Sequence, residues 1–381
     1  MSLVDDVRRG LGGLDRAADA ASVAALVRRQ APAAGTTALL EATGRMVAEV
    51  IGAGVLEPLL REPDVTDVLV NGPGVVWLDR GRGLERSDVE VVDDIELRRL
   101  AQRLVASCGR RLDDAVPYAD ARLPDGTRVH AVLPPVSPQG TCLSLRLPPR
   151  RTFTLEELVA AGSLSSDGAA MLSSLIDARL AFVVTGGTGT GKTTVLSTLL
   201  SLVPRAARLV LVEDAAELRP HHPHVVRLEA RLPNAEGAGA VDLSALVRQA
   251  LRMRPDRLVV GEVRGAEVRD LLTALNTGHE GGCGTVHANR PEHVPARFEA
   301  LGAVAGLSRP AVHSQLAVAL DAVVHLTRDR AGQRRIAGIA VLVAGDDGVV
   351  RAVPAVTFTR DGGLEPGPGD AVLRRMLAAA R

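Results

Sequence analysis

A run of glycines that ends in a lysine and a threonine is the clearest chemical signal in the chain. Residues 186–193 fit the pattern G-x-x-x-x-G-K-[ST], in which glycines let backbone N–H groups converge on phosphate oxygens. Lys192 is the only lysine among 45 basic residues, and its compact ammonium can reach the β and γ phosphates of a nucleotide where a guanidinium would clash. Thr193 would contact Mg²⁺ through its hydroxyl. The predicted nucleotide contacts are Gly186, Gly187, Thr188, Gly189, Thr190, Gly191, Lys192, Thr193 and Thr194.

The residues on either side predict the strand and the helix that such a loop needs. Residues 180–185 form a short apolar run, typical of a buried parallel strand, and apolar residues recur at helical spacing from Val195 to Val203. The unpaired N–H groups and partial positive charge of the helix N-terminus would then face the phosphates. A glycine-rich turn with a chance lysine does not explain this order of elements.

Two further apolar runs end in carboxylates, which hydrolysis of a nucleotide would need. One leads directly into Glu213 and Asp214 and continues to Glu217, and the other delivers Glu262. Ligands of α/β sheets bind beyond the C-terminal ends of strands, so these groups are candidates for organising a metal and orienting water. A solvated acidic turn is the alternative for the first group.

Histidines occur in two places that could have a function. His279 and His287 lie on either side of a glycine-rich predicted strand. A single histidine is usually structural, so the pattern alone leaves the role of both open. His221, His222 and His224 could suggest a metal site, but no cysteine or carboxylate lies at ligand spacing and a polar loop explains them.

The composition limits the class of protein. The 381 residues carry 45 basic and 45 acidic side chains, so no net charge attracts the chain to nucleic acid or anionic lipid. The three cysteines have no C-x-x-C spacing, which suits a reducing cytoplasm and argues against structural zinc. The first ten residues include four charges, and no uncharged stretch reaches about 18 apolar residues. We expect a protein that is neither exported nor membrane-spanning.

The order of predicted elements divides the chain into two main domains. Residues 61–147 predict a small mixed α/β domain, with a proline-rich, stiff linker over 148–151. Residues 152–330 alternate strands with helices and predict a mostly parallel sheet of the RecA-like kind. An alanine-rich helical segment over 1–60 and a C-terminal extension over 331–381 complete the chain.

Together these motifs resemble the secretion ATPases of type II and type IV systems, specifically the TadA/CpaF branch that drives assembly of Flp-type pili. The chain lacks the paired cysteine motifs of the type II pilus-extension ATPases, which favours this branch. Gly284 departs from the pattern, because a hydroxyl or larger residue would be expected there. The resemblance covers about residues 60–330. Its motifs are the Asp box at 212–218, the Walker B region at 250–265, the His box at 277–289 and two N-terminal segments at 65–72 and 120–129.

The resemblance implies a hexameric ring that binds ATP between a smaller, PAS-like N-terminal α/β domain and a RecA-like P-loop domain. Arginines of the N-terminal domain approach the phosphates in such enzymes. Arg128 and Arg146 are the candidates, because each lies by a strand-forming segment near the linker. An arginine that stabilises a transferring phosphate can be worth about 10³ in rate. Structural ion pairs are the alternative for both.

The resemblance also assigns roles to the acidic residues and to one histidine. Glu262 would polarise the attacking water, with Glu217 as the second candidate. Glu213 and Asp214 would organise Mg²⁺ through water, and His287 would sense the γ-phosphate. The predicted catalytic residues are Glu262, Glu217, Lys192 and His287, and the predicted metal site comprises Thr193, Glu213 and Asp214.

The resemblance thus implies a cytoplasmic ATPase motor that powers pilus assembly or secretion. It would associate with the inner face of the membrane through a polytopic platform protein. The alternative is a RecA-like ATPase stimulated by nucleic acid, or one for conjugation-type DNA transfer. One Trp, one Tyr and four Phe make a poor set for base stacking, which argues against nucleic acid as a direct partner. A GTP switch would need an N-K-x-D motif, and the single lysine excludes it.

Overall fold

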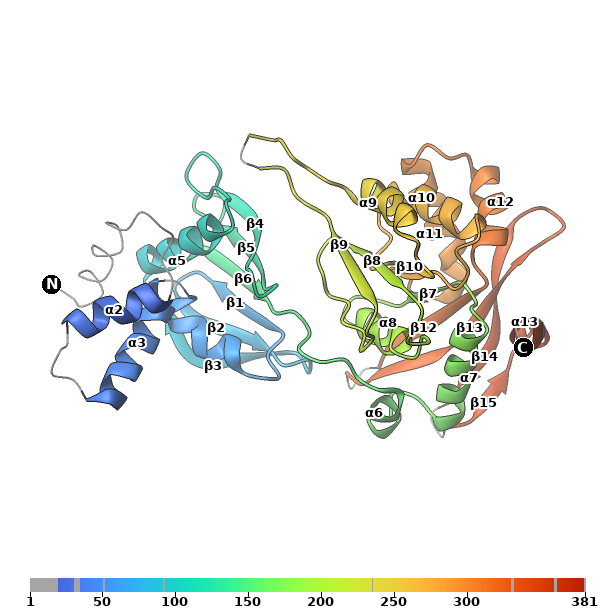
Figure 1. Ribbon diagram of the computed structural model, residues 1–381, viewed down its shortest axis with the longest axis horizontal. Helices are drawn as coiled ribbons and strands as arrows, with labels where there is room; N and C mark the ends of the chain where they lie inside the picture. Colours follow the sequence, from blue (N-terminus) through green and yellow to red (C-terminus); the bar gives the residue numbers. More distant parts are fainter. Residues whose placement is uncertain are drawn as a thin grey trace. The chain divides into compact units, whose positions relative to one another are not determined.

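The chain forms two compact units, Met1–Pro148 and Pro149–Arg381 (Figure 1). The computed structural model describes residues 20–30, 35–50, 52–91, 93–234, 236–329, 332–359 and 362–379. Residues 1–19 and 31–34 of the expected helical segment 1–60 lie outside this range. The first helices are α2 (Ala20–Gln30), α3 (Thr36–Val50), the 3₁₀ turn η1 (Gly54–Leu56) and α4 (Glu57–Arg61).

Six of the described strands form an antiparallel sheet in the first unit, hereafter the N-terminal sheet. Their order is β3-β2-β1-β6-β5-β4. Alternate residues such as Val68 and Val70 share one core with Leu97 and Leu100 of the helix α5, which confirms the predicted mixed α/β unit. The bounds are β1 (Asp67–Asn71), β2 (Gly74–Asp79), β3 (Leu84–Val91), α5 (Asp94–Ser107), β4 (Tyr118–Arg122), β5 (Arg128–Val132) and β6 (Cys142–Arg146).

Nine of the described strands form the sheet of the second unit, hereafter the C-terminal sheet. Their order is β15-β14-β13-β12-β7-β11-β10-β8-β9. All neighbouring pairs from β12 to β9 are parallel, as predicted for a RecA-like fold. These strands are β7 (Phe182–Thr185), β8 (Leu209–Glu213), β9 (Val225–Glu229), β10 (Arg257–Val260), β11 (Cys283–Val286) and β12 (Ala322–Arg328).

Helices cover both faces of the C-terminal sheet (Figure 1). Successive residues of β7 point to opposite cores, with Val183 in one and Phe182 and Val184 in the other. Strands buried on both faces need continuous apolar runs, which explains the sequence of β7. One face carries α9 (Leu243–Ala250), α10 (Glu267–Asn276), α11 (Val294–Val304) and α12 (Arg309–Ala319), and the other carries α6 (Leu155–Ala160), α7 (Ser166–Asp177), α8 (Lys192–Leu200) and α13 (Asp370–Ala379).

The segment expected as a C-terminal extension adds antiparallel strands to this sheet. It contributes β13 (Arg334–Ala344), β14 (Val350–Phe358) and β15 (Leu364–Pro366), and β13 pairs with β12. Two 3₁₀ turns, η2 (Leu251–Met253) and η3 (Pro291–His293), complete the second unit. Over the ranges that the structure describes, no helix combines the length and apolar character required to span a bilayer.

Candidate active site

The loop between β7 and α8 has the geometry that its glycines predict. Gly186 and Gly191 have φ of 152° and 93°, a region that favours glycine. A Cβ on Gly186 would lie 2.7 Å from the carbonyl oxygen of Leu326, so the loop also approaches β12 too closely for a side chain. Helix α8 begins at Lys192, directly after this loop, and its first N–H groups are directed toward the loop. The structure therefore places the predicted glycines, lysine and threonine in one strand–loop–helix unit.

Lys192 turns back onto this loop. Its side chain is 8% exposed, and Nζ donates to the carbonyl oxygens of Gly186 at 3.1 Å and Gly187 at 2.9 Å. The hydroxyl of Thr190 donates to the same Gly187 oxygen at 2.9 Å. The ammonium is thus held beside the backbone amides of the loop, at the position from which it can contact a phosphate.

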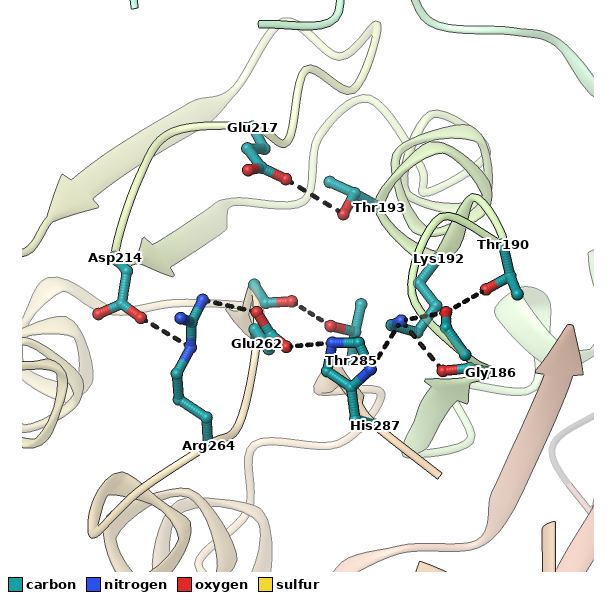
Figure 2. A network of polar contacts seen from close by, with 12 residues as sticks. Gly186, Thr190, Lys192, Thr193, Asp214, Glu217, Glu262, Arg264, Thr285 and His287 are labelled. Carbon is teal, nitrogen blue, oxygen red and sulfur yellow. Dashed lines mark hydrogen bonds and ion pairs between the residues drawn. The ribbon is translucent and has the colours of Figure 1, made fainter. Parts of the chain in front are cut away.

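Four neighbouring strands bring the other charged residues to the same edge. In the sheet β7, β11, β10 and β8 lie side by side and parallel, so their C-terminal ends meet. One residue of interest follows each of these ends: Lys192 after β7, His287 after β11, Glu262 after β10 and Asp214 after β8. Sheet order therefore places residues that are up to 95 positions apart in one row, the strand-end series (Figure 2).

Contacts join the members of the strand-end series in one continuous chain. Lys192 Nζ lies 3.4 Å from His287 Nδ1, and His287 Nε2 lies 2.8 Å from Glu262 Oε1. Arg264, two residues after Glu262, donates from Nη2 to Glu262 Oε2 at 2.6 Å, and its Nε forms an ion pair with Asp214 Oδ2 at 3.0 Å. The series therefore runs from the phosphate loop to the loop after β8.

The imidazole of His287 is neutral in this arrangement. Burial and the neighbouring Lys192 ammonium lower the pKa of His287 below its ordinary value of 6.5, although the Glu262 carboxylate acts in the opposite direction. A neutral ring with its proton on Nε2 suits both contacts, because the Glu262 carboxylate can only accept and Nδ1 then faces the Lys192 ammonium. His287 thus links the lysine to the carboxylate without carrying a charge of its own.

The backbone around Glu262 is held on both sides. The Thr285 hydroxyl on β11 donates to the Gly261 oxygen at 2.7 Å, and Val263 N–H donates to the Thr285 oxygen at 2.8 Å. Gly284 packs so closely against β10 that a Cβ would lie 2.5 Å from the Val260 oxygen. The glycine that departs from the family pattern is therefore explained by the close approach of these two strands.

Adjacent carboxylates after β8 have different surroundings. Glu213 is 3% exposed, and its Oε1 accepts from the backbone N–H groups of Glu217 and Leu218 at 3.0 and 2.9 Å. Burial raises the pKa of Glu213 from 4.5 to about 7, against the effect of those two amides. Asp214 is exposed and pairs with Arg264. The contacts of Glu213 are those of a residue that shapes the loop, whereas Asp214 faces the other charged groups.

Glu217 approaches the start of α8. The Thr193 hydroxyl lies 3.5 Å from Glu217 Oε2 (Figure 2). Hydroxyl and carboxylate oxygens suit Mg²⁺, which binds through one or two protein groups together with phosphates and water. Among the residues that the structure describes, no group of three or more His, Cys, Asp and Glu could hold a metal alone. The donors present fit a metal that arrives with a nucleotide.

The other histidines make local contacts. His279 Nδ1 donates to the Ala274 oxygen in the last turn of α10 at 3.1 Å. His222 Nε2 donates to the Pro204 oxygen at 3.1 Å, and His224 Nε2 accepts from Arg208 at 2.9 Å. These ring nitrogens are hydrogen-bonded to separate protein groups, which agrees with a polar loop at residues 221–224.

The predicted arginines lie on the N-terminal sheet. Arg146 and Arg128 are direct partners on β6 and β5, and Arg128 is the partner of Arg122 on β4. Directly paired residues share a face, so these three form one arginine row across the sheet. Asp67 of β1 lies opposite Arg146 at the end of the row.

Sequence reasoning did not single out Arg264 as a site residue. The signal available was its position two residues after Glu262, beyond the end of an apolar strand. That position gains meaning only from the order of strands, because β8 lies beside β10 and brings Asp214 within reach.

Comparisons with known proteins agree with this fold. Residues 49–352 match the family model described as Type II/IV secretion system protein. The putative conjugal transfer protein Rv3659c of Mycobacterium tuberculosis (strain ATCC 25618 / H37Rv) is 57% identical over 314 residues, 81% of this chain and 89% of that protein. The conjugal transfer protein TrbB of Rhizobium radiobacter is 30% identical over 282 residues, 72% of this chain and 83% of that one.

A solved structure is similar in fold. The X-ray structure of the ATPase DotB of Yersinia pseudotuberculosis aligns with a TM-score of 0.53 at 19% identity, over 81% of this chain and 80% of that one. These matches confirm the expected relationship to secretion ATPases of type II and type IV systems. The chain belongs to the type II/IV secretion system protein family.

Proposed function

We propose that this chain is an ATP-hydrolysing motor for secretion or pilus assembly. The observation that carries the proposal is the strand-end series, in which Lys192, His287 and Glu262 contact one another beside a phosphate-binding loop. Cleavage of a phosphoanhydride needs a cation at the phosphates, a metal site and a group that orients water. The residues at this edge supply all three kinds of group. The family match supports turnover of the nucleotide rather than binding alone.

The loop and α8 bind the phosphates in this proposal. Backbone N–H groups of the loop and of the helix N-terminus donate to phosphate oxygens, and the helix dipole favours their negative charge. Lys192 exchanges its carbonyl partners for the β and γ phosphates, which requires only rotation of its side chain. Bound Mg²⁺ would neutralise charge on the same phosphates. Thr193 would hold it directly and Asp214 through water, as the sequence predicts. Glu217, near Thr193, takes the place of the predicted Glu213 in this proposal, because the Glu213 carboxylate accepts from two backbone N–H groups of its own loop.

Glu262 is the proposed base, with Glu217 as the second candidate. Both oxygens of Glu262 are already oriented, one by His287 and one by Arg264. A carboxylate fixed in this way can accept a proton from water and direct its attack on the γ-phosphate. His287 connects this carboxylate to the phosphate-binding lysine, which supports its proposed role as the sensor of the γ-phosphate.

The arginine row is proposed to act on the nucleotide within a hexameric ring. Like charges directly opposite one another on a sheet repel, so the phosphates of a nucleotide would add to the groups that already offset the charges of Arg128 and Arg146, such as Asp67 opposite Arg146. Arginine near a transferring phosphate stabilises the charge that develops in the transition state. In the proposed ring the ATP site is completed by the N-terminal domain, and the motion that follows hydrolysis acts on a polytopic membrane platform protein from the cytoplasmic side.

A phosphate-release assay tests the proposal against its alternative. The full chain with ATP and Mg²⁺ is expected to hydrolyse ATP, and single-stranded DNA is expected to leave the rate unchanged. Strong stimulation by single-stranded DNA would instead favour conjugation-type DNA transfer, a role that the names of two relatives suggest. Absence of turnover with and without DNA would contradict both.

A further inference from the structure

Arg264 joins two carboxylates that come from different strands. It follows β10 and pairs with Glu262 on its own loop and with Asp214 on the loop after β8 (Figure 2). We propose that Arg264 is a positioning residue that sets the orientation of the Glu262 carboxylate, with Asp214 as its anchor. This inference rests on the proposed function, because it assigns Arg264 to the base of that reaction.

The main chain at Arg264 is fixed, so that its side chain is the part free to rotate. The N–H groups of Arg264 and Gly265 both donate to Oε1 of Glu267, at 2.6 and 2.7 Å. Glu267 is 5% exposed and lies in the first turn of α10. The Arg264 side chain, in contrast, is 47% exposed. The fixed main chain thus carries a guanidinium that can turn toward or away from Glu262.

The geometry requires a guanidinium rather than an ammonium. Arg264 contacts two carboxylates at once, since Nε forms an ion pair with Asp214 at 3.0 Å and Nη2 donates to Glu262 at 2.6 Å. The planar fork holds these two donors at a fixed angle, whereas a lysine offers one compact charge on a flexible stem. Asp214 therefore fixes the plane of the guanidinium, and that plane fixes Glu262 Oε2.

His287 holds the other oxygen of the same carboxylate. With Oε1 bonded to His287 at 2.8 Å and Oε2 to Arg264, the torsion of the Glu262 carboxylate is set from both sides. Small errors in the position of a reacting group lower the rate of a reaction strongly while they leave substrate binding intact. Arg264 would then affect kcat and leave the KM for ATP unchanged.

A purely structural ion pair is the other interpretation of Arg264. Arg248 offers a matched control, because it pairs with Asp270 at 3.3 Å, is 51% exposed and lies on α9, outside the strand-end series. Exposed pairs of this kind contribute little to stability. If Arg264 were only such a pair, Arg264→Ala and Arg248→Ala would have the same small effects on melting temperature and on turnover.

The experiment measures kcat, KM and melting temperature for the full chain with ATP and Mg²⁺. Arg264→Ala is expected to lower kcat by about 10- to 100-fold with KM unchanged. Its melting temperature should equal that of Arg248→Ala. Arg264→Lys should restore only part of the rate, since one ammonium cannot bridge both carboxylates. At saturating Mg²⁺, where the proposed water-mediated metal contact of Asp214 does not limit the rate, Asp214→Asn combined with Arg264→Ala should lower kcat no further than Arg264→Ala alone, because the two residues act in sequence.

Each of the other outcomes contradicts one part of the inference. An unchanged kcat in Arg264→Ala, or full rescue by lysine, overturns the positioning role and leaves the proposed ATPase activity standing. Independent, multiplicative losses in the double variant overturn Asp214 as the anchor. Absence of turnover in the unmodified chain contradicts the proposed function itself, and the inference falls with it.

Discussion

The two sheets of this protein place their charged residues in opposite ways. In the C-terminal sheet, charges of both signs lie beyond the strand ends, and contacts that include the neutral His287 join them from Lys192 to Asp214. In the N-terminal sheet, the arginine row places three like charges at the ends of adjacent strands, with Asp67 opposite Arg146. The first arrangement contains charges of both signs, whereas the second sets like charges opposite one another, with the Asp67 carboxylate at its end. The comparison indicates that a group of mixed charges can be held by its own contacts, whereas a row of like charges depends on the anionic groups around it.

Of the changes that test this comparison, removal of Lys192 should have the largest effect on ATP turnover. Lys192→Ala is expected to abolish ATP turnover, a loss of at least about 10²-fold, because the charge opposite the phosphates disappears. Lys192→Arg keeps the charge and should also be inactive, since a planar fork does not replace a compact ammonium in the loop. Phosphate release measures both. Normal turnover in the arginine variant would show that charge alone suffices.

Glu262→Gln should separate binding from chemistry. The amide keeps the shape of the carboxylate but cannot accept a proton, so hydrolysis is expected to fall by about 10²- to 10⁴-fold while ATP still binds. Fluorescent-nucleotide binding and phosphate release on the same sample measure the two effects. If Glu217→Gln is inactive and Glu262→Gln hydrolyses normally, the roles of the two carboxylates are the reverse of those proposed.

The arginine row predicts an effect that depends on assembly. Arg128→Ala and Arg146→Ala should each lower turnover, by up to about 10³-fold, in a ring. Arg98→Ala is the control, since Arg98 forms an ion pair with Asp114 on the same unit, away from the row. Analytical ultracentrifugation with ATP gives the oligomeric state and phosphate release gives the rate. Full activity of a strictly monomeric chain would contradict a role of these arginines across subunits.

The smallest expected effect concerns stability and its dependence on pH. Because the pKa of Glu213 is raised from 4.5 to about 7 in the fold, the unfolded chain loses this proton first. The free energy of unfolding should therefore fall as pH rises from 4.5 to about 7, by on the order of 3 kcal/mol. Glu213→Gln keeps an oxygen for the two amides and does not ionise.

Urea unfolding at pH 5 and pH 8 measures this effect. The variant should show a smaller decline in stability between the two values than the unmodified chain. An equal decline in both would mean that Glu213 titrates normally in the folded state.

The sequence predicted the parts of the site that depend on local order. The strand before Gly186, the loop and the helix from Lys192 follow from apolar periodicity and glycine spacing, and the structure has them in that order. The position of Glu262 at the tip of a predicted strand also follows from the apolar run that precedes it. These features are continuous in the chain, so neighbouring residues determine them.

Other features depend on which strands are neighbours, and periodicity does not contain this information. The role of Arg264 requires β8 beside β10, and the different surroundings of Glu213 and Asp214 require the packing around β8. Strand β3 was not predicted, because its residues are mostly polar and exposed and give no apolar alternation. Its antiparallel pairing with β2 follows from the short turn between the two strands and from the backbone groups that β2 presents at the edge of the sheet.

Calorimetric titration of the full chain with ATP and Mg²⁺ tests the central claim most directly. The claim is that the loop at Lys192 and the strand ends beside it form a nucleotide site. Saturable binding that is lost in Lys192→Ala and retained in Glu262→Gln is the predicted result. Absence of binding to the unmodified chain, or equal binding by the Lys192→Ala variant, would contradict it.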